Sequence, residues 1–375
     1  MHKRSEAILR QVLLEAQRLS AYDVGETVDG LARRLGRKPS EILKLNSNEN
    51  FFVPLDLLRN VLREVVEEVD PRIYPRDELK ELREALSRYV NASPEEIVIG
   101  TGSDQLIDLI SRVFLRHGDE ALSVVPTFSI YERCIEVQGA HYKAVPLRDD
   151  FTLDTEKILA SATPRTKLLF ICSPNNPTAN QFDSREVRLL AGNFGGLVAI
   201  DEAYVDFAEG SVVDLVGGFE NLVVFRTFSK VFGLAGLRLG CMVANRELAR
   251  AIDERFQMPY AVSIVALKAA LKLLRKTEII MAAVEEVKAE RTRLIRELDR
   301  LEGVRAFDSK TNFVLFQVDR SSDKVYRALL DRGVIVRNIG PVLRFDNCLR
   351  VTVGPPPMTE RFLSALSEVL AEDAT

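Results

Sequence analysis

The sequence predicts an α/β protein of two domains: a large doubly wound domain around a mostly parallel sheet, then a smaller α+β domain at the C-terminal end. Three observations lead to this prediction. The chain of 375 residues is longer than a usual single domain. Between about residues 45 and 260, short β-rich runs alternate with helical patterns. From about residue 261 the pattern changes to a long charged helix followed by short apolar runs.

The large domain, residues 46–260, is predicted from apolar runs whose continuity is typical of buried parallel strands. The runs are EEIVIG, ALSVVP, KLLFICSP, LVAID and NLVVFRT. Helix-like stretches such as 104–116 and 184–192 separate them. Ligands of such open sheets bind at the carboxyl ends of the strands, so we expect the functional site there.

The two ends of the chain have different patterns. Residues 1–45 are expected to form a helical arm, with an apolar face that packs on the body or on a partner subunit. That face consists of Ile8, Leu9, Val12, Leu13, Ala16 and Leu19. The C-terminal domain, residues 261–375, combines a charged helix over 278–301 with a helix near 324–331 and the runs FVLFQV, VIVRN and LRVTV. We expect a small antiparallel sheet in this domain.

Composition excludes several classes of function. A formal net charge of −4 argues against a nucleic-acid or anionic-membrane partner. The longest apolar stretch, 260–274, is interrupted by Lys268 and Lys272, so no membrane span is expected. Charged residues such as Glu6 and Arg10 occur where a signal peptide needs an apolar block. We therefore expect a cytoplasmic protein.

Metal and histidine chemistry are poorly supported. The four cysteines and three histidines are scattered, without the spacing of a zinc site or a histidine-based triad. We expect no metal site. The chemistry is left to lysine, aspartate, tyrosine and arginine side chains.

Unusual residues follow the strands of the predicted sheet. Gly102, Ser103 and Asp104 lead from the first strand into a helix, whose free N–H groups suit a phosphate, although small residues turn many strands into helices. Phe128 follows the second strand, where an aromatic ring stacks on a flat heterocycle or simply packs. Asn176, in a turn pinned by prolines, suits a ring hydroxyl or a plain surface turn equally well.

The last two strands end in Asp201 and Lys230. A carboxylate at the end of an apolar strand needs a positive partner, which a protonated ring nitrogen or a structural arginine would provide. The spacing from Asp201 to Tyr204 allows both side chains to face one site. Lys230 lies among small and apolar residues, and loss of water lowers the pKa of an amine, which favours imine formation. Donors for a phosphate come from Thr227, Ser229 and Arg238.

The order of these motifs resembles the fold-type I pyridoxal-phosphate (PLP) aminotransferases over nearly the whole chain. The motifs are the phosphate loop, the stacking aromatic, N-N-P-T, D-E-A-Y and T-F-S-K with G-L-R-x-G. Segments 45–50, 74–75, 201–204 and 348–354 resemble most closely those of the histidinol-phosphate aminotransferases. The resemblance implies the PLP-transferase fold, pyridoxal 5′-phosphate as cofactor, and an amino donor and a 2-oxo acid as substrates.

The resemblance also assigns roles to residues. Lys230 forms the Schiff base, Asp201 pairs with the ring nitrogen, and Asn176 and Tyr204 bind the ring oxygen, while Phe128 stacks on the ring. The phosphate is assigned to Gly102, Ser103, Asp104, Thr227, Ser229 and Arg238. Tyr74 reaches the phosphate of the neighbouring subunit, which implies a homodimer with shared sites. The substrate is assigned to Arg350, with Arg337, Tyr22 and Asn48 as helpers.

Two departures from the family pattern and several alternatives remain. The chain has Phe51-Phe52 where the family often continues with proline, and Ala179-Asn180 where it often has glycine, so the loop backbone at residue 179 is expected to differ. The function expected is histidinol-phosphate:2-oxoglutarate transamination. An aromatic amino acid aminotransferase, a decarboxylase of a phosphorylated amino acid and a non-catalytic scaffold or sensor are the alternatives.

Overall fold

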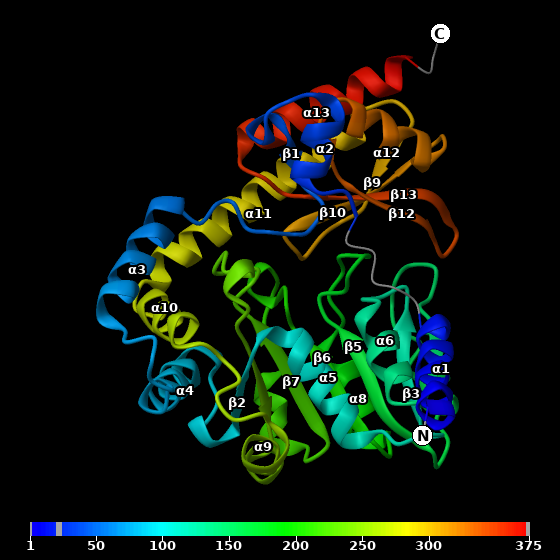
Figure 1. Ribbon diagram of the computed structural model, residues 1–375. Helices are drawn as coiled ribbons and strands as arrows, with labels where there is room; N and C mark the ends of the chain where they lie inside the picture. Colours follow the sequence, from blue (N-terminus) through cyan, green and yellow to red (C-terminus); the bar gives the residue numbers. More distant parts are fainter. Residues whose placement is uncertain (1, 20–24, 373–375) are drawn as a thin grey trace.

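Within the residues that the structure describes, 2–19 and 25–372, the large domain is built on a seven-stranded sheet of order β2-β8-β7-β6-β5-β3-β4. Figure 1 shows this computed structural model of the protein. Strand β8 is antiparallel to both its neighbours, and the other neighbouring strands pair in parallel. The strands are β2 (Ile97–Gly100), β3 (Glu120–Val125), β4 (His141–Pro146), β5 (Thr166–Cys172), β6 (Leu197–Asp201), β7 (Leu222–Thr227) and β8 (Gly240–Ala244). The predicted doubly wound, mostly parallel sheet is confirmed.

Strands β4 and β8 were not predicted from the sequence. Strand β4 lies at the sheet edge, where only Val145 is buried, so it has no continuous apolar run. Strand β8 is fully buried, but it is short and directly follows segment 233–239, which contains two glycines. Its antiparallel direction brings the chain back from the site at the end of β7.

Alternate residues of the strands contribute to two separate cores, because successive side chains of a strand point to opposite faces. In β6, Leu197 and Ala199 face one core and Val198 and Ile200 the other. The first core is covered by α5 (Gly102–Phe114), α6 (Ile130–Val137) and α9 (Arg246–Ala251). The second is covered by α4 (Asp77–Val90), α7 (Thr155–Ala160), α8 (Ser184–Asn193) and α10 (Ile264–Leu274). By the same alternation, Asp201 points to the face that carries α5 and α6.

The second lobe contains the predicted small antiparallel sheet, of order β12-β13-β10-β9. Its elements are β9 (Val304–Ala306), β10 (Phe313–Val318), α12 (Ser322–Asp331), β12 (Arg337–Val342), β13 (Phe345–Thr352) and α13 (Pro356–Glu372). The long helix α11 (Thr277–Asp299) runs to this lobe from the side of α10 and α3 (Leu55–Glu68) (Figure 1). The α+β character expected from the sequence is confirmed.

The N-terminal segment contributes to the second lobe. Helix α2 (Val28–Leu35) packs there, and β1 (Leu43–Lys44) pairs in parallel with β11 (Val334–Ile335). Helix α10, which the sequence places after the large domain, packs against α4 and α3 of that domain. The exact limits of the arm and the two domains therefore remain a prediction.

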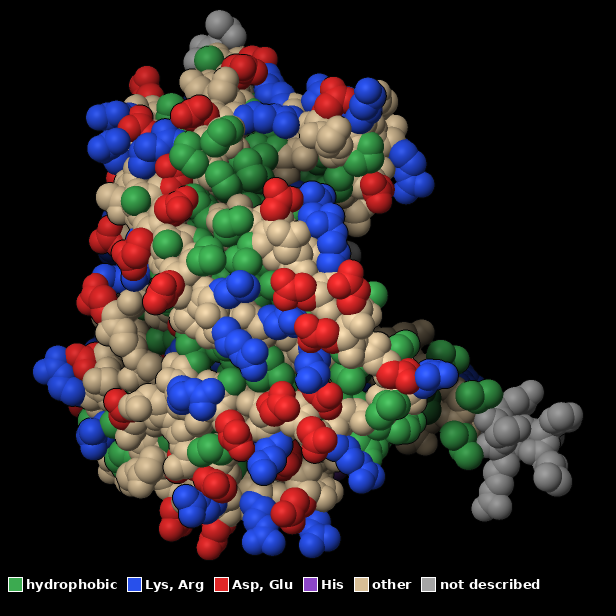
Figure 2. All heavy atoms as spheres, turned by 90° about the vertical axis from the view of Figure 1, so that its left-hand side faces the viewer, with side chains coloured by type: hydrophobic (Ala, Val, Ile, Leu, Met, Phe, Trp, Pro, Cys, Tyr) green, Lys and Arg blue, Asp and Glu red, His purple; other side chains and the backbone are tan. Residues whose placement is uncertain are grey.

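Helix α1 (His2–Arg18) projects beyond the rest of the surface (Figure 2). Ile8, Leu9, Val12 and Leu13 are each more than half exposed, so the apolar face of α1 does not pack on the body of its own chain. In the described ranges, no helix has both the length and the apolar character that crossing a membrane requires.

Candidate active site

A cavity of about 260 Å³ lies at the carboxyl ends of the strands of the large sheet, between the two lobes. Its lining includes most residues that the sequence analysis singled out, namely Asn48, Ser103, Asp104, Phe128, Asn176, Asp201, Tyr204, Thr227, Ser229, Lys230, Arg238, Arg337 and Arg350. Lining residues without a role in that analysis are Asn46, Ser47, Glu49, Cys172, Ala203 and Ala235. The polar sequence after β1 could have indicated residues 46–49. Cys172 could not have been identified from the sequence, because its place in the cavity follows from its pairing with Asp201 between β5 and β6.

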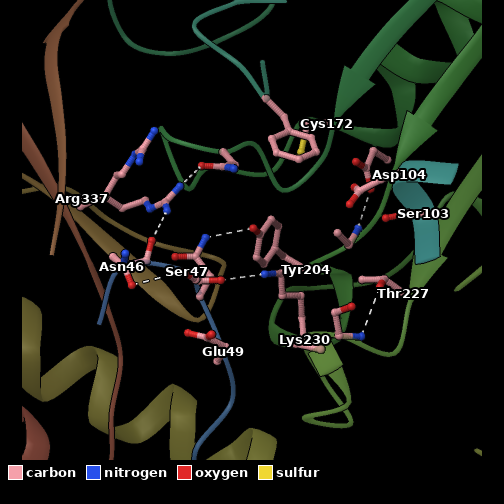
Figure 3. A pocket seen from close by; sticks show the side chains of 18 of the residues that line it. Asn46, Ser47, Glu49, Ser103, Asp104, Cys172, Tyr204, Thr227, Lys230 and Arg337 are labelled. Carbon is pink, nitrogen blue, oxygen red and sulfur yellow. Dashed lines mark hydrogen bonds between the residues drawn. The ribbon is translucent and has the colours of Figure 1, made fainter. Parts of the chain in front are cut away.

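Lys230 follows β7 and lies near the middle of the cavity, beside Tyr204 (Figure 3). Its Nζ donates a hydrogen bond to the backbone oxygen of Ser47 at 2.9 Å and lies 5.7 Å from the Tyr204 ring centre. Burial, with a smaller contribution from the Arg350 cation, lowers the pKa of Lys230 to about 8. About a tenth of this amine is therefore neutral and nucleophilic at pH 7, far more than of a lysine with the ordinary pKa.

Asp201 is a buried carboxylate that has hydrogen bonds but no cation. Its Oδ2 accepts from the Tyr131 hydroxyl at 2.8 Å, and its Oδ1 accepts from the backbone N–H of Ala203 at 3.1 Å. Among the described residues, no lysine or arginine forms an ion pair with it. Burial raises the pKa of Asp201 to about 6, against the opposing effect of the Tyr131 hydrogen bond. A structural arginine, one alternative left open by the sequence, is not what Asp201 contacts.

The environment of Asp201 fits the ring nitrogen of pyridoxal phosphate. A buried carboxylate is costly unless a positive group compensates it. A protonated ring nitrogen supplies that positive charge and one N–H donor. Together with the lysine amine in the same cavity, this donor set matches the cofactor that the sequence predicts.

One end of the cavity is built to hold a phosphate. Helix α5 begins at Gly102, which has φ +81°, and the side chain of its N-cap residue, Thr101, forms no capping hydrogen bond. The guanidinium of Arg238 reaches Ser229 Oγ at 3.4 Å and Asp104 Oδ2 at 3.1 Å. A Cβ at Gly102 would lie 2.9 Å from this guanidinium, so glycine keeps the space open. Free helix N–H groups and an arginine together form an anion site; Thr227 also lines it.

Tyr204 and Asn176 connect this cavity to the second lobe. Asn48 Nδ2 donates to the Tyr204 hydroxyl at 3.0 Å, and burial raises the pKa of Tyr204, which keeps the hydroxyl protonated. Arg350 donates to Asn176 Oδ1 at 2.5 Å and to the Asn46 backbone oxygen at 2.8 Å. The sequence analysis did not predict the hydrogen bond between Asn48 and Tyr204.

Arg337 and Arg350 form a second cationic group at the other end of the cavity. They are direct cross-strand partners on β12 and β13, and both line the cavity. Figure 3 places Arg337 across the cavity from Asp104 and Thr227, with Tyr204 and Lys230 between them. Like charges directly opposite each other on neighbouring strands are unfavourable, and a bound anion relieves this repulsion.

Tyr74 and Tyr22 differ from the other predicted residues. Tyr74 does not line the cavity; its side chain is 71% exposed and its ring stacks on Tyr260 at 4.6 Å. Tyr22 lies outside the described residues. Phe128 lines the cavity and contacts the Tyr131 ring edge to face at 5.7 Å, so it can support a flat ligand as well as pack.

The loop after Asn176 keeps a conformation that favours glycine. Ala179 is fully buried and has φ +63°, in the left-handed region. Asn180 holds the loop, because it accepts a hydrogen bond from Thr178 and donates to the Phe151 backbone oxygen at 3.0 Å. At Ala179 the chain therefore carries a Cβ without leaving the left-handed region.

Residues 40–366 match the family model described as "Aminotransferase class I and II". The chain is 39% identical to the histidinol-phosphate aminotransferase of Roseiflexus castenholzii, over 94% of this chain and 96% of that protein. It is 38% identical to the protein of the same name from Methanosarcina mazei, over 92% and 93% of the two chains.

Solved structures give the same result. The histidinol-phosphate aminotransferase of Sinorhizobium meliloti in complex with pyridoxal-5′-phosphate is similar with a TM-score of 0.85 and 26% identity, over 94% of this chain and 96% of that one. The L-threonine-O-3-phosphate decarboxylase of Porphyromonas gingivalis, with a TM-score of 0.76 and 23% identity over 88% and 100% of the two chains, shares the fold.

The fold and the cavity define a pyridoxal-phosphate-dependent aminotransferase, an enzyme that uses an amino donor and a 2-oxo acid. The chain belongs to the aminotransferase class I and II family, in the branch of the histidinol-phosphate aminotransferases. The predictions of the fold, the cofactor and the transaminase class are confirmed, and the non-catalytic scaffold is rejected.

Proposed function

We propose that the protein transfers the amino group of histidinol phosphate to 2-oxoglutarate. The observation that carries this proposal is a cavity with two separate anion-binding ends and an amine between them. Arg238 and the start of α5 hold the cofactor's phosphate, which leaves Arg337 and Arg350 for an anionic group of the substrate. The names of the most similar relatives support histidinol phosphate as the donor.

The residues of the chain have distinct tasks in this reaction. Pyridoxal phosphate, when bound, supplies an aldehyde and a ring that withdraws electrons from the substrate's Cα. Lys230 holds the aldehyde end and, as a free amine, takes the proton from the Cα of the donor. Asp201 pairs with the ring nitrogen, and Tyr204 and Asn176 bind the ring oxygen. Phe128 supports the face of the ring.

Rates with three amino donors test the substrate assignment. With 2-oxoglutarate as acceptor, histidinol phosphate should give a higher kcat/KM than phenylalanine or aspartate. If phenylalanine gives the highest value, the protein is an aromatic amino acid aminotransferase, and if carbon dioxide is released from a phosphorylated amino acid, it is a decarboxylase.

Arg337→Gln sharpens this test. Loss of one charged hydrogen-bond donor should lower kcat/KM for histidinol phosphate by about tenfold to a hundredfold. The value for phenylalanine should change less, because its single carboxylate retains Arg350. Equal losses for both donors would contradict a phosphate-binding role for Arg337.

We also infer that the enzyme is a homodimer with shared active sites. The exposed apolar side chains of α1 and the exposed pair Tyr74 and Tyr260 need a partner surface. Apolar patches of this kind are typical of protein–protein interfaces. Tyr74 would then reach the phosphate end of the neighbouring cavity.

Mixing two inactive variants tests the shared site. Lys230→Ala and Tyr74→Ala subunits, unfolded together and refolded, should regain part of the activity that each lacks alone, since one mixed site has both residues intact. No recovery, or a monomer in analytical ultracentrifugation, would contradict the shared site. A cytoplasmic location, also proposed here, is tested by cell fractionation.

A further inference from the structure

Tyr131 is a fully buried residue of α6 that touches two residues of the cavity without being among those that line it. Its hydroxyl donates to Asp201 Oδ2 at 2.8 Å. One face of its ring stacks on Phe170 of β5, with ring centres 5.0 Å apart and nearly parallel planes. Its ring also meets Phe128 at a right angle, with centres 5.7 Å apart.

These contacts fix the hydroxyl firmly. Phe170 lies in the centre of the sheet and is paired with Ala199, two residues before Asp201 on the same face of β6. The ring of Tyr131 therefore rests on the strand next to the one that carries Asp201. Its hydroxyl has little freedom to move away from the carboxylate.

Asp201 depends on this hydroxyl. Each of its oxygens accepts one hydrogen bond that the structure records, Oδ2 from Tyr131 and Oδ1 from the backbone of Ala203. Both bonds favour the charged form, whereas burial disfavours it, and burial dominates. Without the hydroxyl, Oδ2 would be a buried acceptor with no donor, which is costly.

A tyrosine suits this position better than a lysine or an arginine would. Burial and the neighbouring Asp201 raise the pKa of Tyr131, so it remains a neutral donor. A neutral donor orients the carboxylate and leaves its negative charge uncompensated. That charge is then available to a cationic group of a ligand.

We propose that Tyr131 is a positioning residue of the transaminase, which orients Asp201 and keeps it ionised for the ring nitrogen while its ring supports Phe128. This inference rests on the proposed assignment of Asp201 to the cofactor. Tyr131 thus positions both Asp201, which would pair with the ring nitrogen, and Phe128, which would support the face of the ring.

The test compares Tyr131→Phe with Tyr89→Phe. Tyr89 also donates to a partly buried carboxylate, Asp206 Oδ1 at 2.6 Å, but it lies outside the cavity, and Asp206 has Arg226 as a cation. Each variant removes one phenolic hydroxyl and keeps the ring. Both should lower the Tm of the apoprotein by a comparable amount.

Only Tyr131→Phe should alter Asp201. In apoprotein labelled with ¹³C at the aspartate carboxyls, with Asp201→Asn identifying the signal, the Asp201 pKa should rise by about one unit in Tyr131→Phe and stay constant in Tyr89→Phe. Affinity for pyridoxal phosphate near pH 6.5 should fall about threefold in Tyr131→Phe, because the ionised fraction of Asp201 falls from about three quarters to about one quarter. The loss should shrink towards pH 8.5, where both proteins have an ionised Asp201.

Two results would overturn the proposal in distinguishable ways. An unchanged Asp201 titration in Tyr131→Phe would show that the hydroxyl does not control the carboxylate. A raised Asp201 pKa with unchanged pyridoxal phosphate affinity would place the error in the assignment of Asp201 to the cofactor. In an Asp201→Asn background, Tyr131→Phe should cost no further affinity, and a further loss of about threefold there would indicate a purely structural role.

Discussion

Two buried carboxylates at opposite ends of the parallel strands of the large sheet have opposite surroundings. Glu120 begins β3, and its two oxygens meet Lys143 and Arg165 at 2.7 Å each, as well as the hydroxyls of Thr163 and Thr166. Asp201 ends β6, and its recorded partners in the described part of the chain are a tyrosine hydroxyl and a backbone N–H. The lysine in its cavity, Lys230, bonds a backbone oxygen instead.

The pKa values follow from these partners. Hydrogen bonds from Lys143 and Thr163 lower the pKa of Glu120 to about 2, whereas burial raises that of Asp201 to about 6. The negative charge of Glu120 is thus compensated by Lys143 and Arg165 of the same chain. Asp201 and Lys230 instead have pKa values that burial shifts away from their ordinary values. Groups with such shifted pKa values are typical of sites that act on a ligand.

The largest expected effect is on kcat, and it separates Lys230 in the cavity from Lys143, which pairs with Glu120. Lys230→Ala should lower kcat for transamination by about 10⁴-fold or more, because the residue that moves the proton is lost. Lys143→Ala serves as the matched control and should leave kcat unchanged. Steady-state rates with histidinol phosphate and 2-oxoglutarate measure both. Activity near that of the wild type in Lys230→Ala would end the proposed mechanism.

The next largest effect separates the two acids. Asp201→Ala should lower kcat by about 10²- to 10⁴-fold, since no carboxylate pairs with the ring nitrogen, while some cofactor stays bound. Glu120→Gln should leave kcat unchanged and lower the free energy of unfolding by about 2 kcal/mol, because its cations lose a charged acceptor. Kinetics and urea denaturation measure the two effects. A stability loss without a rate loss in Asp201→Ala would make Asp201 a structural acid like Glu120.

The sequence carried most of the information about the cavity, but only as residue types. Asp201, Tyr204 and Lys230 stand directly after apolar strands, and in a parallel sheet the carboxyl ends of neighbouring strands lie together. Their convergence could therefore be predicted from position alone. Strand β4 could not, because an edge strand with one buried residue lacks the apolar run on which the prediction depends.

Contacts between distant segments were beyond the sequence. The sequence analysis gave Tyr131 no role, and nothing local indicates that its hydroxyl reaches Asp201. The bond between Asn48 and Tyr204 and the register that sets Arg337 opposite Arg350 likewise depend on how the lobes pack. Local periodicity contains no information about such pairings.

The two carboxylates should also give opposite pH dependence of stability in the apoprotein. The folded pKa of Asp201, about 6, lies above the ordinary 3.8, so the folded state binds more protons between about pH 4 and 6. Its contribution to the free energy of unfolding therefore increases as the pH falls through that window, by at most about 3 kcal/mol. For Glu120 the folded pKa is below the ordinary 4.5, and its contribution is lost as the pH falls from about 4.5 to 2.

Urea denaturation of the apoprotein at several pH values checks these signs. The difference in stability between the wild type and Asp201→Asn should change between pH 4 and 6 and be flat above pH 7. The difference between the wild type and Glu120→Gln should change only below about pH 4.5. A flat difference for Asp201→Asn across the acidic range would contradict the raised pKa.

The smallest expected effect concerns Arg165, which is the more exposed of the two cations of Glu120. Arg165→Gln should lower the free energy of unfolding by less than about 1 kcal/mol, since an exposed arginine gains little from an ion pair and Glu120 retains Lys143 and both threonines. Urea denaturation at pH 7 measures the change, and kcat should not alter. A loss above about 2 kcal/mol would mean that Glu120 depends on one partner, as Asp201 depends on Tyr131. The number of hydrogen-bonding partners would then not distinguish the structural carboxylate from the functional one.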